Sequence, residues 1–335
     1  MLSIESPHGG SNPSTTAHIL FMKILVTGGN GFIGSNLIKS LLQQKHKVVS
    51  LDDLSIGLKE YEVEGCHYHY GDIELIHLMD KDFDLIYHLA ALSRIQPSFK
   101  NPTETFRVNS NGTLAVCEFA KKIDARVIYS GSSSKWQNHL NSPYACSKYL
   151  GEEYVKLYKH VYKLDAEIVR FYNVYGPGEL VDGNWAALIG LWRSQIKNNQ
   201  PLIIVGDGEQ RRDFTHIEDI VDGLIKIGLG VEKHEDAWEL GTGHNYSINE
   251  VFNMFKEVFD VDKIIVPDQL GNYKTSERIN NDAIGSGSHS EGFQIIAVGN
   301  YSHAEGVSTE ARGVGSHAEG GYTSNVTYSP TFPFS

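Results

Sequence analysis

Two side chains that could move a proton stand four residues apart, in the sequence Tyr-Ala-Cys-Ser-Lys at residues 144–148. In a helix, residues four apart share one face, so the Lys148 ammonium can lie near the Tyr144 phenol and favour its ionised form. Tyrosine is otherwise a poor base at neutral pH. The pair predicts proton transfer to and from a hydroxyl group, provided that a second positive charge helps to lower the pKa of the phenol. A helix face in contact with solvent meets the same spacing and is the alternative.

A glycine-rich turn separates a strand pattern from a helix pattern near the start of the chain. Residues 24–26 are an apolar run typical of a buried parallel strand, and a helical apolar period follows through residues 33–42. The glycines between them follow the spacing G-x-x-G-x-x-G, which permits a sharp turn and close approach of the backbone to a pyrophosphate. The helix N-terminus favours an anion because its N–H groups are free. We therefore expect a dinucleotide to contact Gly28, Gly31, Phe32, Ile33 and Gly34.

A second strand pattern at residues 47–52 ends in Asp52, 18 residues beyond Gly34. A carboxylate there can accept hydrogen bonds from the adenosine ribose hydroxyls and repels a 2′-phosphate, so the pattern favours NAD over NADP. A turn aspartate that caps the next element is the alternative. The positive nicotinamide ring of oxidised NAD would supply the second charge that Tyr144 needs.

Further strand patterns at residues 67–73, 83–91 and 126–129 predict an α/β fold with a doubly wound parallel sheet. The carboxyl ends of parallel strands open on one crevice, so residues 90–93 are expected to line the dinucleotide. Asp72 could meet the adenine edge, although a carboxylate that caps a loop explains it equally well. Asn109 opens a helix pattern and is expected at the cofactor or as a helix cap.

The composition restricts the partners. The chain of 335 residues has 41 acidic and 29 basic residues and a formal charge of −12, which argues against nucleic acid or a membrane surface because both are polyanionic. Three cysteines outside any metal-ligand pattern indicate a reducing compartment, so we expect a cytoplasmic protein with no metal site. No window of the sequence reaches transmembrane length. Residues 1–21 are interpreted as a polar extension.

Five motifs then stand in the order seen in a known family. They are Thr-Gly-Gly-Asn-Gly-Phe-Ile-Gly at residues 27–34, His-Leu-Ala-Ala at 88–91, Tyr-Ala-Cys-Ser-Lys at 144–148, Arg-Phe-Tyr-Asn-Val-Tyr-Gly-Pro-Gly at 170–178 and Arg-Asp-Phe at 212–214. In these motifs the chain resembles the extended short-chain dehydrogenase/reductases, and among them the NAD-dependent nucleotide-sugar epimerase/dehydratase branch. The resemblance covers residues 22–281.

This resemblance implies roles for individual residues. Ser132 takes the position of the catalytic Ser or Thr, Tyr144 that of the acid/base, and Lys148 that of the lysine that binds the ribose and lowers the pKa of the tyrosine. Asn173 and Arg212 match positions that contact the nucleotide diphosphate of the substrate. The predicted cofactor-binding set also includes Ile73, Leu89, Ala90, Ala91, Lys148 and Phe171, and the predicted substrate-binding set includes Ser93, Ser132 and Tyr144.

The stretch at residues 201–219 independently suggests a phosphate site. Arg211 and Arg212 are candidates for bidentate phosphate contacts, and one of the two is expected to face solvent. His216 and Asp219 are expected to order the loop and cap a helix at residues 217–227. Residues 238–241 predict a late strand that rejoins the sheet, and residues 249–258 predict a helix with an apolar stripe.

Two departures from the family pattern narrow the predicted function. The loop before Tyr144 is shorter than usual, which puts the substrate selectivity in question. Sugar 4,6-dehydratases typically carry an Asp-Glu pair just after the catalytic Ser or Thr, and Ser133 and Ser134 cannot do that acid–base work. We therefore expect a UDP-hexose 4-epimerase that acts through a 4-keto intermediate. A dehydratase or reductase on the same scaffold, or a non-catalytic structural or adhesive fusion protein, are the alternatives.

The sequence changes character after residue 281. Gly285, Gly299 and Gly313 repeat at a period of 14, and a Ser-His-x-Glu-Gly segment recurs with the same period. Such a repeat predicts a stacked β-coil and resembles the β-roll of trimeric bacterial adhesin heads and phage tail fibres. The recurring His and Glu are expected to form a structural ladder and not a metal site.

These patterns divide the chain into five predicted segments: a polar extension at residues 1–21, an NAD-binding domain at 22–175, a substrate-binding lobe at 176–281, β-roll repeats at 282–325 and a tail at 326–335. The repeats stand where the family usually has a last substrate contact and a terminal helix. We expect a homo-oligomer. A dimer through the helices after Asn109 and around Tyr144 is favoured over a trimer through the repeats.

Overall fold

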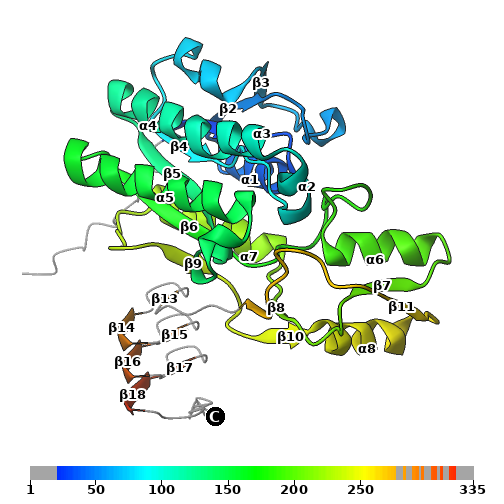
Figure 1. Cartoon of the computed structure of the whole chain (residues 1–335). Coiled ribbons are helices and arrows are strands. Elements are labelled where there is room, and N and C mark those ends of the chain that lie inside the picture. Colours follow the sequence, from blue (N-terminus) through cyan, green and yellow to red (C-terminus); the bar gives the residue numbers. More distant parts are fainter. Residues whose placement is uncertain are drawn as a thin grey trace, which may run out of the picture.

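The computed structural model describes residues 21–276 and, farther along the chain, six short strands between residues 282 and 321 (Figure 1). Residues 21–276 form a large sheet with helices on both faces and a smaller lobe. The predicted tail and all but the last residue of the predicted polar extension lie outside the described residues. Within the described part, no helix combines the length and the apolar character that a bilayer crossing requires.

The large sheet has seven parallel strands in the order β3-β2-β1-β4-β5-β6-β9. Their bounds are β1 Lys23–Thr27, β2 Lys47–Asp52, β3 His67–Tyr70, β4 Leu85–His88, β5 Arg126–Ser132, β6 Ala166–Phe171 and β9 Trp238–Leu240. The chain moves outward from β1 in one direction and from β4 in the other, so the loops after these two strands diverge at a switch point, where α/β sheets bind ligands. This sheet confirms the predicted doubly wound fold, and β9 is the predicted late strand.

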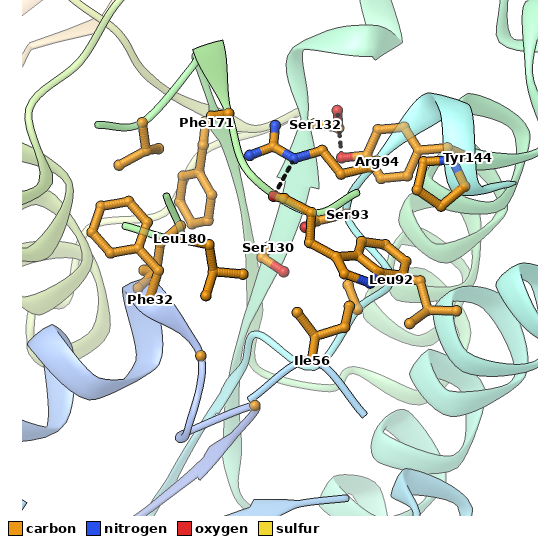
Figure 2. A pocket seen from close by; sticks show the side chains of 18 of the residues that line it. Phe32, Ile56, Leu92, Ser93, Arg94, Ser130, Ser132, Tyr144, Phe171 and Leu180 are labelled. Carbon is orange, nitrogen blue, oxygen red and sulfur yellow. Dashed lines mark hydrogen bonds between the residues drawn. The ribbon is translucent and has the colours of Figure 1, made fainter. Parts of the chain in front are cut away.

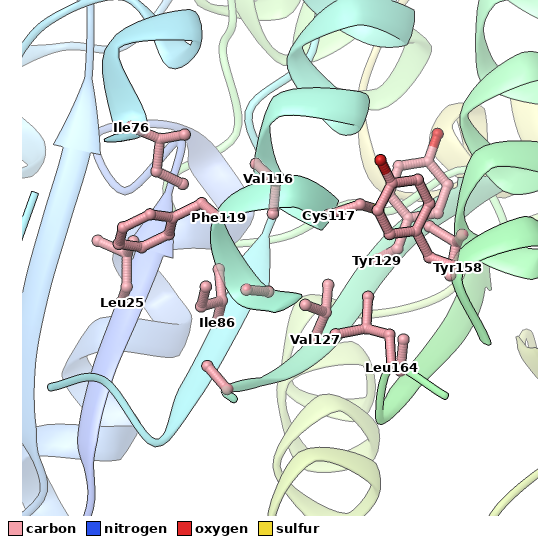
Figure 3. Close-up of a cluster of buried hydrophobic side chains, with 14 of the residues drawn as sticks. Leu25, Ile76, Ile86, Val116, Cys117, Phe119, Val127, Tyr129, Tyr158 and Leu164 are labelled. Carbon is pink, nitrogen blue, oxygen red and sulfur yellow. The ribbon is translucent and has the colours of Figure 1, made fainter. Parts of the chain in front are cut away.

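Helices cover both faces of the sheet. The helices α1 (Phe32–Gln43) and α7 (Ile217–Leu229) pack on one face, and α4 (Gly112–Ile123) and α5 (Pro143–Tyr162) pack on the other. Figure 3 shows Val116 and Phe119 of α4 facing Leu25 of β1 and Ile86 of β4, all four at most 3% exposed. Burial of side chains of this size contributes roughly 1.5–3 kcal/mol each, so this contact holds the helices that carry the site against the sheet.

The helix that carries Asn109 begins earlier than predicted. Pro102 occupies the first turn of α3 (Pro102–Phe106), where its restricted φ and missing N–H are tolerated, and the chain continues through the π-helical turn η3 (Arg107–Asn111) into α4. Asn109 therefore lies inside a continuous helical segment, so the prediction of a helix cap there is wrong. Such π turns occur frequently at functional sites.

The smaller lobe has a hydrophobic cluster of its own. Its helices are α6 (Leu188–Lys197) and α8 (Ile248–Val258), and its strands are β7 (Leu202–Val205), β8 (Arg211–Asp213), β10 (Asn245–Ser247), β11 (Lys263–Val266) and β12 (Thr275–Ser276). Buried Trp192 of α6 meets Phe252 of α8 edge to face, with ring centroids 6.4 Å apart. Ser247 and Glu250 form a capping box at the start of α8. The lobe therefore has its own core, whereas α7 and β9 of the predicted segment 176–281 belong to the large sheet.

Short helical elements connect the larger ones. They are α2 (Ile95–Lys100) and the 3₁₀ turns η1 (Lys59–Tyr61), η2 (Ile73–Leu78), η4 (Ser133–Trp136) and η5 (His139–Asn141). Two of these elements, η2 and η4, begin just after a strand of the large sheet, next to the carboxyl ends at which the predicted site lies.

The strands beyond residue 276 follow the 14-residue period of the sequence. β14 (His289–Phe293), β16 (His303–Val307) and β18 (His317–Gly321) pair in parallel, with the three histidines as register partners. β13 (Asp282–Ala283), β15 (Ile296–Ala297) and β17 (Glu310–Ala311) pair in a second parallel sheet. These described strands agree with the predicted stacked β-coil.

Candidate active site

A cleft of about 570 Å³ opens at the carboxyl ends of the parallel strands, and residues of the smaller lobe, among them Arg212 and Tyr273, also line it. Figure 2 shows some of the side chains on the side of the large sheet. Most residues that the sequence marked for a site line this cleft together. They are Gly28, Gly31, Phe32, Ile33, Gly34, Asp52, Ile73, Leu89, Ala90, Ala91, Ser93, Ser132, Tyr144, Lys148, Phe171, Asn173 and Arg212. Of the residues predicted to bind cofactor or substrate or to act in catalysis, Asp72 and Asn109 do not line the cleft.

The turn between β1 and α1 leaves no room for larger residues. A Cβ atom on Gly28, which has φ of +74°, would lie 2.7 Å from the Ala90 nitrogen, and one on Gly34 would lie 2.2 Å from the Gly28 carbonyl oxygen. Gly31 is the N-cap of α1, and no side chain caps the helix there. Because the first N–H groups of α1 have no side-chain partner and face the cleft, the turn fits the pyrophosphate of a dinucleotide.

Asp52 is buried at the end of β2 with its carboxylate at the cleft. Its Oδ2 atom accepts a hydrogen bond from the Asn30 N–H at 2.9 Å, and its Oδ1 atom accepts one from the Leu54 N–H at 2.8 Å. Burial raises the pKa of this carboxyl, and the two N–H groups oppose the shift. Asp52 thus orders its own loop, as the alternative prediction held, and still lines the cleft with lone pairs left for ribose hydroxyls.

Asp72 has a different role from the predicted contact with adenine. Its Oδ1 atom accepts a hydrogen bond from the Glu74 N–H at 2.8 Å and caps η2, and its Oδ2 atom lies 2.7 Å from Arg107 Nη2. The Arg107 guanidinium lowers the pKa of this carboxyl. The neighbours Gly71 and Ile73 line the cleft, whereas the Asp72 side chain is directed to these partners. The structure therefore supports the loop-capping alternative.

Asn109 lies outside the cleft and forms hydrogen bonds with two elements that line it, the loop after β4 and α5. Its Oδ1 atom accepts a hydrogen bond from the Leu92 N–H at 2.8 Å, and its Nδ2 atom donates to the Leu92 carbonyl at 3.1 Å. The same Nδ2 atom donates to Ser147 Oγ on α5 at 3.0 Å. A single buried amide thus connects the loop after β4 to the helix that carries Tyr144 and Lys148, which explains why it lies mid-helix instead of at a cap.

Two hydroxyl groups converge on the Ser132 side chain at the end of β5. The Tyr144 hydroxyl lies 3.3 Å from Ser132 Oγ, and the Ser134 hydroxyl donates to the same oxygen at 2.9 Å (Figure 2). Because Ser132 Oγ accepts these bonds, its own proton is left to donate to a bound oxygen. Burial raises the pKa of the Tyr144 phenol, while the hydrogen bond to Ser132 and the charge of Arg94 lower it.

Lys148 is buried one turn after Tyr144, and its amine reaches back to the sheet. The Nζ atom donates to the Ser130 carbonyl oxygen at 2.5 Å and lies 3.4 Å from Ser130 Oγ. Burial lowers the pKa of Lys148 to about 8, and the nearby charge of Glu152 opposes this shift. The Lys148 amine is thus bound to β5, and the cation whose charge lowers the pKa of Tyr144 is Arg94.

A buried ionic network lies behind Lys148. Arg170 of β6 is fully buried and donates Nε and Nη2 to the two carboxylate oxygens of Glu152 on α5, at 3.0 Å and 2.8 Å. Its Nη1 atom donates to Glu239 Oε1 of β9 at 2.7 Å. This bidentate arrangement ties α5 to two strands of the sheet, next to the end of β5 that carries Ser132.

The two adjacent arginines of β8 have opposite environments. Arg212 lines the cleft, where it stacks 4.1 Å from the centroid of Tyr273 and donates to Asn272 Oδ1 at 2.8 Å. Arg211 donates instead to Glu250 Oε2 of α8 at 3.0 Å. One of the predicted phosphate candidates thus faces the cleft and the other stabilises the lobe. Asn173, also in the cleft, donates Nδ2 to the Asp213 carbonyl at 3.0 Å.

The prediction did not include several polar residues of the cleft. Arg94, Glu179 and Tyr273 all line the cleft. Arg94 follows the His-Leu-Ala-Ala motif by three residues and is the only basic residue between Ala91 and Lys100, which is the signal that could have identified it. Glu179 accepts a bond from Arg193 Nη1 at 3.0 Å, and its Oε2 atom is buried without a hydrogen-bond partner among the described residues.

Comparison with curated proteins places the chain among nucleotide-sugar enzymes. It is 33% identical over 251 residues to a putative UDP-glucose 4-epimerase of Methanocaldococcus jannaschii, which covers 70% of this chain and 81% of the relative. It is 30% identical over 253 residues to the UDP-glucose 4-epimerase of Mycolicibacterium smegmatis, and this match covers 69% of this chain and 80% of the relative. UDP-glucuronic acid decarboxylase 4 of Arabidopsis thaliana is 27% identical over 262 residues, and this match covers 71% of this chain and 58% of the relative.

Solved structures and a family model agree with this placement. UDP-N-acetylglucosamine 4-epimerase of Methanobrevibacter ruminantium has a TM-score of 0.72 at 29% identity, with 77% of this chain and 89% of that one covered. A dTDP-glucose 4,6-dehydratase of Streptomyces venezuelae, solved with NAD bound, has a TM-score of 0.70 at 25% identity, with 76% and 88% covered. NAD is bound in the dehydratase structure, and the glycine turn and Asp52 of this chain fit that cofactor. The model of the NAD dependent epimerase/dehydratase family matches residues 24–241, and this chain belongs to that family.

Proposed function

We propose that this chain is a nucleotide-sugar epimerase that inverts C4 of a UDP-hexose with bound NAD. The observation that carries the proposal is the pairing of the Tyr144 hydroxyl with Ser132 Oγ at 3.3 Å, inside the cleft that also contains the glycine turn and Asp52. A general acid/base must lie within hydrogen-bond reach of the proton it moves, and this pair offers a base and a hydrogen-bond donor to one sugar hydroxyl.

In this proposal the residues of the chain handle the proton. The Tyr144 phenolate accepts the proton of the C4 hydroxyl, and Ser132 donates a hydrogen bond to the same oxygen as its bond to carbon becomes a carbonyl. NAD, when bound, supplies reversible hydride acceptance from C4. The 4-keto sugar then turns over, its other face is reduced, and Tyr144 returns the proton to the oxygen. The reaction has no net redox change, so the cofactor is expected to stay bound.

Lys148 has a supporting part in this proposal. Its amine is held at 2.5 Å by the Ser130 carbonyl at the end of β5, on the same strand as Ser132. From this position it can present its remaining N–H groups to the ribose of a dinucleotide in the cleft, which is the role that the resemblance implied. Lys148 thus connects the cofactor to the strand that carries Ser132.

The residues after Ser132 argue against dehydration. A 4,6-dehydratase needs an acid to protonate the leaving hydroxyl and a base to remove the C5 proton. Ser133 and Ser134 occupy those positions, and the Ser134 hydroxyl is already bound to Ser132 Oγ at 2.9 Å. A serine hydroxyl is a poor acid and a poor base near neutral pH, so the two positions after Ser132 lack the groups that the Asp-Glu pair supplies in a dehydratase.

The test is to incubate the protein with UDP-, GDP- and dTDP-sugars and to follow the products by NMR. The expected product is the C4 epimer of a UDP-hexose at an equilibrium ratio. The Tyr144→Phe variant should retain NAD and lose turnover by at least about 100-fold, the lower range for general acid–base catalysis. Tyr154→Phe, on the same helix but outside the cleft, is the matched control and should keep wild-type activity.

Two results would contradict the proposal. A 4-keto-6-deoxy sugar or stoichiometric release of NADH would show a dehydratase or a net oxidoreductase. A folded protein that neither binds NAD nor converts any nucleotide sugar would favour the non-catalytic alternative.

A further inference from the structure

We propose that Arg94 binds a carboxylate on the sugar ring, so that the preferred substrate is a UDP-hexuronate and not a neutral UDP-hexose. This inference rests on the proposed function, because it concerns the sugar that reaches Tyr144. It assigns a use to a cation in the cleft that the motifs of the chain leave unexplained.

The first observation is the position of the guanidinium. Arg94 lies in the loop after β4, just before α2, and its Nε atom donates to the Trp185 carbonyl oxygen at 2.9 Å. This single bond holds the side chain across the cleft, and Figure 2 shows it on the same side of the pocket as Ser132 and Tyr144. Its charge is close enough to act on the Tyr144 phenol. Arg94 therefore faces the place where the sugar reacts.

The second observation is the missing counter-ion. Among residues 21–276, no carboxylate forms an ion pair with Arg94, and the terminal Nη1 and Nη2 atoms have no hydrogen-bond partner in that part of the chain. Burial lowers the pKa of Arg94, which reflects the cost of holding the charge away from water. Glu179 is the one acid whose charge acts on it, and Glu179 is already bound by Arg193 at 3.0 Å. A half-buried guanidinium with free donors is poised for an anion that the protein does not supply.

The third observation concerns which anion this would be. Arg212 lies beside Asn173 in the cleft and is the cation assigned to the diphosphate. Arg94 is a second cation, and it is the one that faces the phenol. The carboxylate of a hexuronate is carried on C5, the carbon next to C4, so a C4 hydroxyl placed at Tyr144 brings the carboxylate into the same region. The planar fork of a guanidinium matches a carboxylate with two parallel hydrogen bonds.

Arg94 also borders a smaller hollow that is shared with Arg212, Asn173 and Leu188. A contact of Arg94 with the diphosphate is therefore the competing explanation. The two explanations differ in what they predict for ligands that lack the carboxylate, because UDP, UDP-glucose and UDP-glucuronate have the diphosphate in common and only the last has the carboxylate.

The experiment uses the full-length protein with NAD and measures kcat/KM for UDP-glucose and UDP-glucuronate, together with calorimetric binding of both and of UDP. The wild type is expected to prefer UDP-glucuronate by at least about tenfold. Arg94→Met should lower the calorimetric affinity for UDP-glucuronate by about 10- to 100-fold, the range for hydrogen bonds to charged groups, and change the affinities for UDP and UDP-glucose by less than about threefold. Arg94→Lys keeps the charge without the fork and should retain part of the preference.

Arg212→Met is the matched control, since loss of a diphosphate contact should weaken all three ligands alike. The inference is overturned if Arg94→Met behaves in the same way, or if the wild type prefers UDP-glucose. In both cases the epimerase proposal stands. If no nucleotide sugar is converted, the proposed function fails, and the calorimetric comparison of UDP-glucuronate with UDP-glucose still tests Arg94. Thermal melting with and without NAD confirms that each variant is folded.

Discussion

The Nζ atom of Lys148 lies 2.5 Å from the carbonyl oxygen of Ser130, so the buried amine of α5 is bound to the end of β5. The sequence spacing predicted that this amine can lie near the Tyr144 phenol. The sheet instead provides a carbonyl acceptor at the base of the cleft, and a buried ammonium needs such a partner. Burial and, to a smaller extent, Tyr273 raise the pKa of the phenol, whereas the hydrogen bond to Ser132 and the charge of Arg94 lower it.

Stability should therefore depend on pH through Lys148. Burial lowers its folded-state pKa to about 8 from the ordinary value of 10.5, so between these values the unfolded chain binds more protons than the folded one. The free energy of unfolding is thus expected to rise with pH across this window, by up to about 3 kcal/mol in total. Lys148→Met should lack this rise, whereas the exposed Lys122→Met should keep it. Urea denaturation of the NAD-free proteins from pH 7 to 10 measures the free energy of unfolding at each pH. If this free energy changes with pH in the same way for the wild type and Lys148→Met, the prediction is refuted.

Substitution of two glycines in the β1–α1 turn should have different effects, one on the stability of the fold and the other on cofactor binding. A Cβ atom on Gly34 would lie 2.2 Å from the Gly28 carbonyl oxygen, so Gly34→Ala is expected to destabilise the fold by at least about 2 kcal/mol. A Cβ atom on Gly31 meets nothing closer than 3.2 Å, and its φ of −83° suits alanine. Gly31→Ala should therefore fold but bind NAD at least about tenfold more weakly, because the methyl group faces the pyrophosphate. Urea denaturation and NAD titration together test this, and equal NAD affinity for wild type and Gly31→Ala would argue against a pyrophosphate at this turn.

Loss of the buried ionic network of Arg170, Glu152 and Glu239 should strongly lower the free energy of unfolding. Arg170→Met would leave the buried Glu239 carboxylate without Arg170 and the buried Glu152 carboxylate with only Lys135, at 3.8 Å, and removal of one partner from a buried network typically costs about 3–5 kcal/mol. The exposed pair of Lys226 with Asp222 is a suitable control, because Lys226→Met should cost less than about 1 kcal/mol. Denaturant unfolding measures both. A cost for Arg170→Met as small as that of the control would show that the network does not hold α5 on the sheet.

The dimer proposed from the sequence has a candidate surface on α5. Leu157 and Val161 lie one turn apart on this helix and are 49% and 53% exposed. An apolar helix face of this kind suits a symmetric helix pair, so Leu157→Glu with Val161→Glu is expected to convert a dimer into a monomer. Light scattering on the variant, and on a chain that ends at residue 281, provides the measurement. A trimer that is lost only on truncation would assign assembly to the 14-residue repeats.

The sequence by itself determined the parts of this protein that depend on local pattern. The turn from β1 to α1 and the full extent of β2 were predicted, because glycine spacing and apolar runs report backbone conformation within a few residues. Tyr144 and Lys148 were placed on one helix for the same reason. The parallel sheet also followed, since strands that alternate with helices pair in parallel.

Only the tertiary structure decided which partner each polar side chain takes. Asn109 resembled a helix cap, yet it binds Leu92 and Ser147 across the fold, and Lys148 binds Ser130 on the sheet. Arg94 belongs to no motif, and its place beside Tyr144 arises from the packing of the loop after β4 against Trp185. Hydrogen-bond partners and unmatched charges depend on residues distant in the sequence, so no local spacing encodes them.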